Sequence, residues 1–367
     1  MERSGRSMET LSKKFPKLAL WERGEVSPTL KQLEDFARAT HTPFGFFFLE
    51  EPPVENVPIP DLRQINNQEL KRPSADLLDT IYLMQRRQAW LREDRIECEA
   101  EPLDFVGSAS LNDSPEDVGR EMRRIVGLDE NWVASVRTWE DAVRELRRAI
   151  EHLGVMAVIN GVVGNHTRRT LKVEEFRGFA LCDEYAPLIF VNGADAKSAQ
   201  MFTLAHELGH IWLGESALTD LGPASSPTQK IEAWCDGAAA EFLVPASALK
   251  DYWSRVRQER TPFEVIARHF KVSPIVAGRR AMDLKLVDRE TFFTFYQEYI
   301  GRERRRPVGI GGDFYNNQNT RVGQMFARQV IYAAMEGRLS FKEAYDLTGL
   351  HGGAFQEYAY RLGISLP

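Results

Sequence analysis

The sequence predicts a mostly helical α+β fold in which a small sheet with a β-hairpin packs against a helix that carries two histidines. Long stretches of the chain repeat apolar residues with helical period, and a central region changes to short apolar runs. Two of these runs, 176–182 and 187–192, are joined by a short turn, which is typical of a hairpin. The helical run 200–212 follows and places His206 and His210 one turn apart.

Residues 1–50 are assigned to a first domain, in which residues 8–50 are expected to form short helices, one of them started by Ser27-Pro28-Thr29. The motif Trp-Glu-Arg-Gly, which ends at Gly24, and the Pro-Thr pair that opens that helix resemble the latter half of an XRE-type helix-turn-helix. Such a domain opens with a further helix, and only seven residues precede Met8, so we interpret the module as truncated. We expect it to serve packing or dimerisation, and DNA binding is the alternative.

The aromatic run 44–49 is expected to be buried against a neighbouring element rather than to stack on nucleic-acid bases. A proline-rich stretch follows, and residues 51–73 are interpreted as an extended linker. Residues 74–250 are assigned to a second domain, whose leading part is helical. Three of its helical runs follow residues that favour the N-cap position, Ser74, Ser114 and Thr138.

Three β-strands are expected in this domain, at 155–158, 176–182 and 187–192. Asp195 is expected to cap the helix that carries the histidines. The sheet should lie against this helix, and its edge strand can pair with the backbone of an extended peptide. We expect the strand at 176–182 to be that edge. The stretch 213–228 contains glycines and serines and is interpreted as a loop near the site.

Residues 251–367 are expected to form a C-terminal helical domain. Residues 262–280 have the rhythm of a helix, a turn and a second helix. If this pair bound DNA, Arg279 and Arg280 would contact phosphates. We favour the interpretation that the pair packs against the rest of the chain. The basic run 302–307 is interpreted as a solvated helix end.

A metal site is predicted from two histidines on one helical run and a glutamate on the next. His206 and His210 are at i and i+4, so both imidazoles can bind one ion, and Glu207 lies near the same rim as a general base. Glu232, on the next helical run, supplies a third ligand and leaves the fourth position open, as in zinc hydrolases. Asp236 lies one turn further and can accept a hydrogen bond from a ligating histidine. The alternative is a core helix with incidental histidines and a solvated Glu232.

These two stretches resemble the ImmA/IrrE family of zinc-dependent peptidases. In that family His-Glu-x-x-His is followed by a helix with the pattern Glu-x-x-(Ala/Cys)-(Asn/Asp), which Glu232 and Asp236 match, and by Leu-x-Pro, here at 243–245. The resemblance implies a zincin-like core of gluzincin type, one Zn²⁺ per chain with Mn²⁺ as the alternative, and Glu207 as the general base. It also implies the metal ligands His206, His210 and Glu232. The family more often has Asn at the place of Asp236.

Three further residues are candidates for roles at this site. Long members of the family have a Gly-Gly-Asp-Phe-Tyr turn that leads to an arginine, here Tyr315 and Arg321. Either side chain is a candidate for stabilising an oxyanion or contacting substrate. Cys182 ends the strand expected beside the cleft. As a thiolate it could occupy the open metal position and keep the enzyme latent until it is oxidised.

Composition excludes several classes of protein. The chain has 367 residues, with 47 basic and 53 acidic side chains and a net charge of −6, so bulk charge does not favour nucleic acid. Three cysteines without tight spacing argue against a disulfide framework and for a reducing compartment. There is no apolar run of membrane-spanning length and no apolar signal segment at the N-terminus, so we expect a cytoplasmic protein.

Two functions are compatible with these features. The first is a zinc endopeptidase that cleaves a partner transcriptional repressor, expected from the resemblance to be a helix-turn-helix protein, and so derepresses stress, mobile-element or phage-defence genes. The alternative is a non-catalytic DNA- or protein-binding regulator with a structural or vestigial metal site. Glu207 favours the first, because a structural zinc site is closed by four ligands and needs no base. The oligomeric state stays open, with a dimer through the N-terminal region as one option.

Overall fold

The structure is a computed structural model that describes residues 6–51, 53, 55, 73–219, 227–302 and 313–365. The chain divides into two compact units. Unit 1 comprises Met1–Pro58 and Asn67–Leu83, and unit 2 comprises Ile59–Asn66 and Met84–Pro367. Most of the linker predicted at 51–73 lies outside the described residues.

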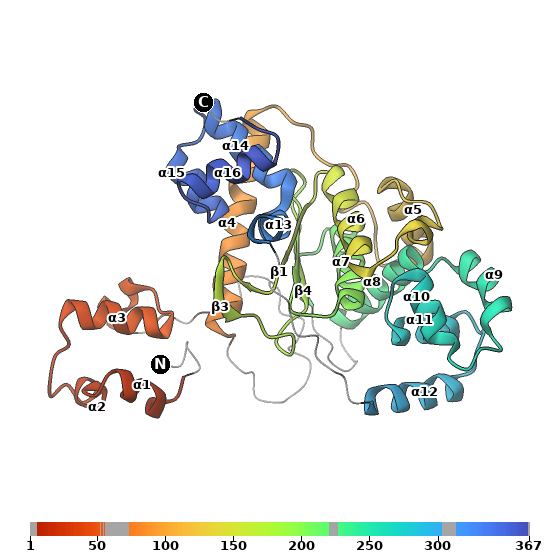
Figure 1. Ribbon diagram of the computed structural model, residues 1–367, viewed down its shortest axis with the longest axis horizontal. Coiled ribbons are helices and arrows are strands. Elements are labelled where there is room, and N and C mark those ends of the chain that lie inside the picture. Colours follow the sequence, from red (N-terminus) through yellow and green to blue (C-terminus); the bar gives the residue numbers. More distant parts are fainter. Residues whose placement is uncertain are drawn as a thin grey trace. The chain divides into compact units, whose positions relative to one another are not determined.

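Unit 1 contains short helices around a small apolar core (Figure 1). They are α1 (Met8–Lys14), α2 (Leu18–Glu22), α3 (Leu30–Thr40) and the 3₁₀ helix η2 (Phe44–Phe48). The side chain of Thr29 accepts a hydrogen bond from the backbone of Gln32 in a capping box, which explains where α3 begins. The expected burial of the aromatic run was wrong, because no residue of η2 is buried and Phe48 is 64% exposed. Phe47 alone packs against Phe36 of the core.

The sheet of unit 2 has four strands in the order β1-β5-β4-β6. They are β1 (Met156–Asn160), β4 (Gly178–Leu181), β5 (Leu188–Asn192) and β6 (Ala217–Thr219). The predicted hairpin is confirmed, because β4 and β5 pair antiparallel, and β1 runs parallel to β5. The prediction that β4 forms the edge was wrong: β6, from the stretch interpreted as a loop, pairs with its other side.

Side chains on the two faces of this sheet enter different environments. Ala180, Ile189 and Val191 join a core that contains Leu204 and Leu208 of α7 (Lys197–Leu213). On the other face the rings of Phe179 and Phe190 stack with centroids 5.0 Å apart. Both faces are therefore buried, which agrees with apolar runs rather than strict polar alternation in the sequence.

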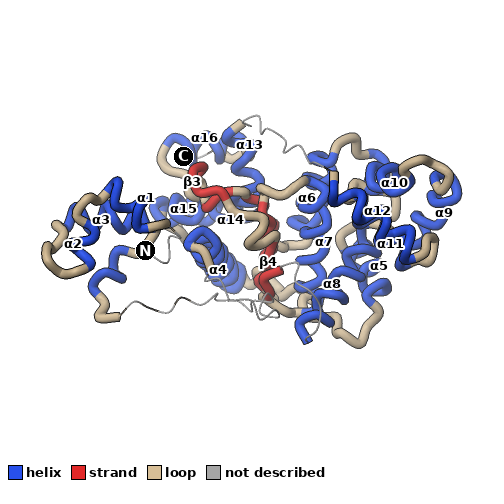
Figure 2. The backbone as a smooth tube through the Cα atoms, turned by 90° about the horizontal axis from the view of Figure 1, so that it is seen from below, coloured by secondary structure: helices blue, strands red, loops and turns tan. Residues whose placement is uncertain are grey.

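Helices cover this sheet from both sides. Figures 1 and 2 place α4 (Ala75–Glu97) and α7 on opposite sides of β4. Gln88 of α4 donates hydrogen bonds to the carbonyls of Leu181 and Ala186, at the two ends of the hairpin turn. α6 (Trp139–His152) and α8 (Pro227–Leu243) pack against α7, and α5 (Pro115–Ile125) packs against α8. A mostly helical α+β fold with a small sheet against the histidine helix is thus confirmed.

A second, two-stranded sheet was not predicted. It pairs β2 (Val162–Val163) with β3 (His166–Thr170), which is largely exposed. The β3 sequence His-Thr-Arg-Arg-Thr has no apolar alternation, so no periodic signal marks it as a strand.

The expected helix pair after residue 250 is present and packs against the core. Its helices are α10 (Pro262–Phe270) and α11 (Pro274–Asp283), between α9 (Ala246–Val256) and α12 (Arg289–Gly301). Arg280 is 3% exposed; its guanidinium is paired with the Glu241 carboxylate and donates to the carbonyl of Val244. Arg279 pairs with Asp283 on the surface. Packing of the pair is confirmed, and a phosphate contact by Arg280 is ruled out by its burial.

Removing the carboxylate from the buried Glu241–Arg280 pair should strongly destabilise unit 2. Glu241→Ala leaves the Arg280 charge buried without its counter-ion, and we expect a loss of about 3–5 kcal/mol in unfolding free energy. Urea denaturation measures the loss. Arg279→Ala on the exposed face of the same helix is the control and should change stability by less than about 0.5 kcal/mol. Equal effects of the two substitutions would contradict this assignment.

The C-terminal part of unit 2 is helical, as expected. It comprises α13 (Phe314–Gln318), the π-helical turn η4 (Asn319–Gly323), α14 (Gln324–Met335), α15 (Phe341–Thr348) and α16 (Gly353–Arg361). Arg87 of α4 donates to the carbonyls of Leu347 and Arg321, which ties this part to α4. Most of the basic run 302–307 lies outside the described residues. None of the helices described is both long and apolar enough for a membrane span.

Candidate metal centre

His206 lies in the middle of α7 and His210 in its last turn, and α7 contacts both the sheet and α8. His206 is 3% exposed and His210 is fully buried. The predicted Asp195 cap was wrong: the N-cap residue is Ala196, and Asp195 pairs with Arg177 instead. Gln200 holds the start of the helix by donating to the carbonyls of Gly193 and Asp195. Hydrogen bonds of Gln200 at the start of α7, and the packing of Leu204 and Leu208 in the core, hold the helix that carries the histidines.

Donor atoms of three side chains converge at this point. The Nε2 atoms of His206 and His210 are 3.2 Å apart, and the two carboxylate oxygens of Glu232 lie 3.2 Å from one Nε2 each. Two donors bound to one zinc ion at roughly 2.0–2.1 Å with a tetrahedral angle are about 3.3 Å apart. Within the described part of the chain, His206, His210 and Glu232 form a group of possible metal ligands whose donor atoms all lie within 4.8 Å of one another. The spacing fits a single small divalent cation, and we call these residues the three-donor cluster.

Asp236 orients one of the histidines. Its Oδ1 lies 3.0 Å from His206 Nδ1, on the side of the ring away from the three-donor cluster. A proton on Nδ1 leaves the Nε2 lone pair for a metal, so this contact favours the tautomer that a ligand needs. Asp236 is one helical turn beyond Glu232 in α8, as predicted from the spacing.

The charges in the three-donor cluster are coupled. Burial alone raises the pKa of Glu232, but hydrogen bonds with His206 and His210 outweigh it and lower the pKa to about 2. Burial lowers the pKa of His206, yet its bonds with Asp236 and Glu232 hold that pKa well above the usual value. Burial keeps the pKa of His210 below its usual value. Glu232 is therefore ionised at neutral pH, as a metal ligand must be.

Glu207 lies on α7 where the helix passes close to β4. Its side chain is fully buried. A Cβ built on Gly178 of β4 would lie 2.8 Å from Glu207 Oε1, 2.6 Å from Thr203 Cγ2 and 2.9 Å from the Phe190 carbonyl oxygen. Any side chain at Gly178 would occupy the space of this carboxylate, so glycine is required there. The sequence analysis did not identify Gly178, although a glycine inside a strand signals such a close approach.

Gly178→Ala should displace the Glu207 carboxylate without removing a donor atom from the three-donor cluster. Misplacing a reacting group by about 1 Å can cost roughly 100-fold in rate, so if Glu207 is the general base that the sequence predicts, we expect a loss of that order in kcat. Zinc affinity should change much less. Parallel measurement of peptide cleavage and zinc binding separates the two effects, and Gly301→Ala, where the added Cβ meets nothing within 4 Å, is the control. Retention of full activity by Gly178→Ala would contradict the assigned contact.

The other candidate site residues are not members of the three-donor cluster. The Cys182 thiol donates to the carbonyl of His210 at 3.4 Å and is not part of the three-donor cluster. Burial raises its pKa to about 12, which disfavours the thiolate that a latch requires. The Tyr315 ring lies under the guanidinium of Arg361, and Arg321 reaches Asn165. The geometry therefore gives no support to a latch by Cys182 or to an oxyanion role for Tyr315 or Arg321.

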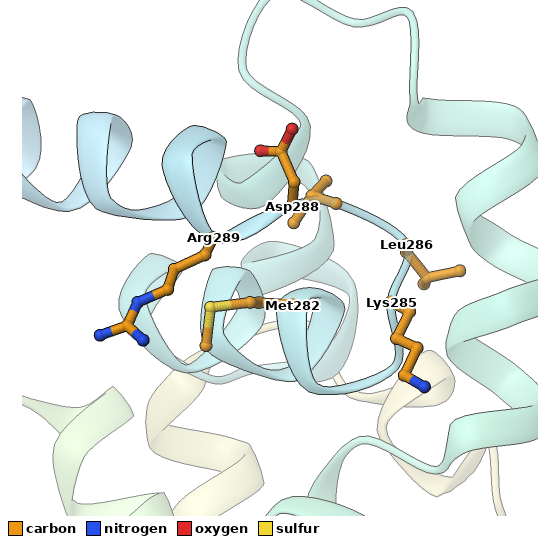
Figure 3. Close-up of a pocket in the computed structure, with 6 residues that line it drawn as sticks. Met282, Lys285, Leu286, Asp288 and Arg289 are labelled. Atoms are coloured by element: carbon orange, nitrogen blue, oxygen red, sulfur yellow. The ribbon is translucent and has the colours of Figure 1, made fainter.

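A surface depression lies at the turn between α11 and α12 (Figure 3). It is lined by Met282, Lys285, Leu286, Val287, Asp288 and Arg289. The carboxylate of Asp288 accepts a hydrogen bond from the backbone of Thr291 and so caps α12. None of the predicted site residues lines this depression, which is distinct from the three-donor cluster.

Comparison with known families agrees with this geometry. Residues 161–282 match the peptidase M78 family, described as the IrrE N-terminal-like domain. The matched range contains α7 and α8, and hence the three-donor cluster, Glu207 and Asp236. Residues 322–361, which span α14 to α16, match a domain of unknown function (DUF8813). No curated protein matches the chain.

Proposed function

We propose that this chain, whose residues 161–282 match the IrrE N-terminal-like domain, is a zinc-dependent endopeptidase of the ImmA/IrrE family. The observation that carries the proposal is the three-donor cluster with the buried carboxylate of Glu207 on the same helix. Three protein ligands leave one coordination position for water or substrate, whereas a structural zinc site uses four. This count disfavours the alternative of a non-catalytic regulator with a structural site.

His206, His210 and Glu232 would hold the cation, and Mn²⁺ is the alternative to zinc. When bound, such an ion acts as a Lewis acid and makes water a nucleophile at neutral pH. Glu207 accepts the proton of the attacking water on a carboxylate oxygen and returns it to the amine that leaves. Asp236 holds the His206 ring in place during both steps.

The substrate is a protein, and we propose a transcriptional repressor of the helix-turn-helix class. Support for this choice comes from the family, whose members cut such partners and so derepress stress, mobile-element or phage-defence genes. The short helices of unit 1 resemble part of the same class of module, and they would serve contact with a partner or a second copy rather than DNA binding. Cleavage of an extended segment suits a site that borders a β-strand.

Sequencing of new protein N-termini in cells tests this function even while the identity of the substrate is open. Cells that express the native chain are compared with cells that express Glu207→Gln, together with candidate helix-turn-helix repressors. The proposal requires new N-termini in a repressor in the first cells alone. If both cell lines yield the same N-termini, the non-catalytic alternative is favoured.

A further inference from the structure

The chain turns back on itself immediately after the histidine helix. α7 ends at Leu213, and its C-cap residue Gly214 has a φ of +71°, the left-handed conformation that favours glycine. The Glu215 N–H donates to the carbonyl of His210. The hydroxyl of Ser216 then accepts a hydrogen bond of 2.8 Å from the Cys182 N–H, just past the end of β4. The residues that follow therefore run back along β4 towards the site.

The returning segment is β6, which pairs antiparallel with β4. Ala217 is the partner of Ala180, and Thr219 is the partner of Gly178. Gly178 is the position at which an added Cβ would lie 2.8 Å from Glu207 Oε1. β6 thus ends opposite the strand residue that borders the catalytic carboxylate.

This pairing uses the side of β4 that a substrate strand would need. A strand has one row of N–H and C=O groups on each side, and β5 already pairs with the opposite side of β4. An extended peptide that adds to β4 beside Glu207 would have to form the bonds that β6 now forms. The two cannot pair with β4 at the same time.

We propose that β6 is a displaceable inhibitory strand, and that an extended substrate segment pairs with β4 only after β6 has left. This inference rests on the proposed endopeptidase function. β6 has three residues, and Ser216 adds one further bond, so the pairing is short enough for a longer peptide to replace it. The rate of cleavage is then scaled by the fraction of molecules in which β6 is detached. The competing arrangement is a substrate that adds to the outer edge of β6.

A disulfide between β4 and β6 separates these arrangements. Residues directly opposite in an antiparallel pair are within reach of a disulfide, so we choose Ala180→Cys with Ala217→Cys. The probe is fluorescein-labelled casein, an unfolded protein, with the zinc-loaded chain. We expect the oxidised form to lose at least 10-fold in cleavage rate relative to its own reduced form. Ala217→Cys alone, for which this ratio should be 1, controls for the natural cysteines.

The disulfide locks β6 onto β4, and proline substitutions in β6 should instead weaken this pairing. Adjacent strand residues direct their N–H groups to opposite sides, so Ala217→Pro with Leu218→Pro removes at least one bond to β4 whichever residue makes it. We expect this variant to cleave casein several-fold faster than the native chain, whereas Leu218→Val, which keeps both N–H groups, should match the native rate. Hydrogen exchange of 178–181 should also become faster in the proline variant.

Hydrogen exchange shows whether casein pairs with β4 even if casein is cleaved poorly. In a Glu207→Gln background, excess casein should restore protection of 178–181 in the proline variant and should have no effect in the oxidised disulfide variant. Cleavage that depends on Glu207 but is equal in oxidised and reduced forms would overturn the inhibitory strand and leave the proposed function intact. Absence of both cleavage and casein protection in every form would overturn the inference. If no substrate is cleaved in a way that depends on Glu207, the result counts against the proposed function itself.

Discussion

Glu207→Gln is expected to lower cleavage by about 10²–10⁴-fold while zinc binding stays close to that of the native chain. The amide has nearly the shape of the carboxylate, so it fits the buried space beside Gly178. It cannot accept a proton from water at neutral pH. The three-donor cluster is unchanged by this substitution, because Glu207 is not one of its members.

The measurement is kcat/KM on the substrate identified from new N-termini, together with zinc content after dialysis. Glu298→Gln is the control, since this glutamate lies on the exposed surface of α12. A residual activity within 10-fold of the native value, at full zinc content, would contradict the role of Glu207 as general base.

Glu232→Ala should have the second large effect, on metal affinity. Loss of an outer hydrogen-bond partner of a ligand typically weakens metal binding by roughly 10–100-fold, and loss of a ligand should cost more. We therefore expect Asp236→Ala to fall in that range and Glu232→Ala to exceed it. Both residues lie on α8 one turn apart, so Asp236→Ala is also a matched control for any effect on the helix.

Competition with a chromophoric chelator measures these affinities for zinc. Glu298→Ala should leave the affinity unchanged. An affinity of Glu232→Ala equal to that of the native chain would show that Glu232 is not a ligand. A larger effect of Asp236→Ala than of Glu232→Ala would indicate that the roles of the two carboxylates are reversed.

The parts of the fold that could be predicted are those set by local sequence. Ser114 and Thr138 each accept a hydrogen bond from the backbone three residues on, and so mark the starts of α5 and α6. The convergence of His206, His210 and Glu232 was predictable because two of these side chains are separated by one helical turn and the third lies on the next helix. Asp236 followed from the same spacing.

The parts that could not be predicted depend on residues that are distant in sequence. β6 consists of three residues in a stretch with the composition of a loop, and its pairing with β4 spans some 40 positions of the chain. Gly178 gains its importance from Glu207, which lies on another element. Tyr315 and Arg321 were proposed from a family pattern without any contact to test it, and the partners that the structure gives them, Arg361 and Asn165, are not members of the three-donor cluster.

Anomalous diffraction at the zinc absorption edge, from crystals of the zinc-loaded native chain, tests the central claim most directly. The account requires one zinc peak per chain, with His206 Nε2, His210 Nε2 and the Glu232 carboxylate as its protein ligands and the fourth position open to water. A peak elsewhere, or a fourth protein ligand such as the Cys182 thiolate, would contradict it.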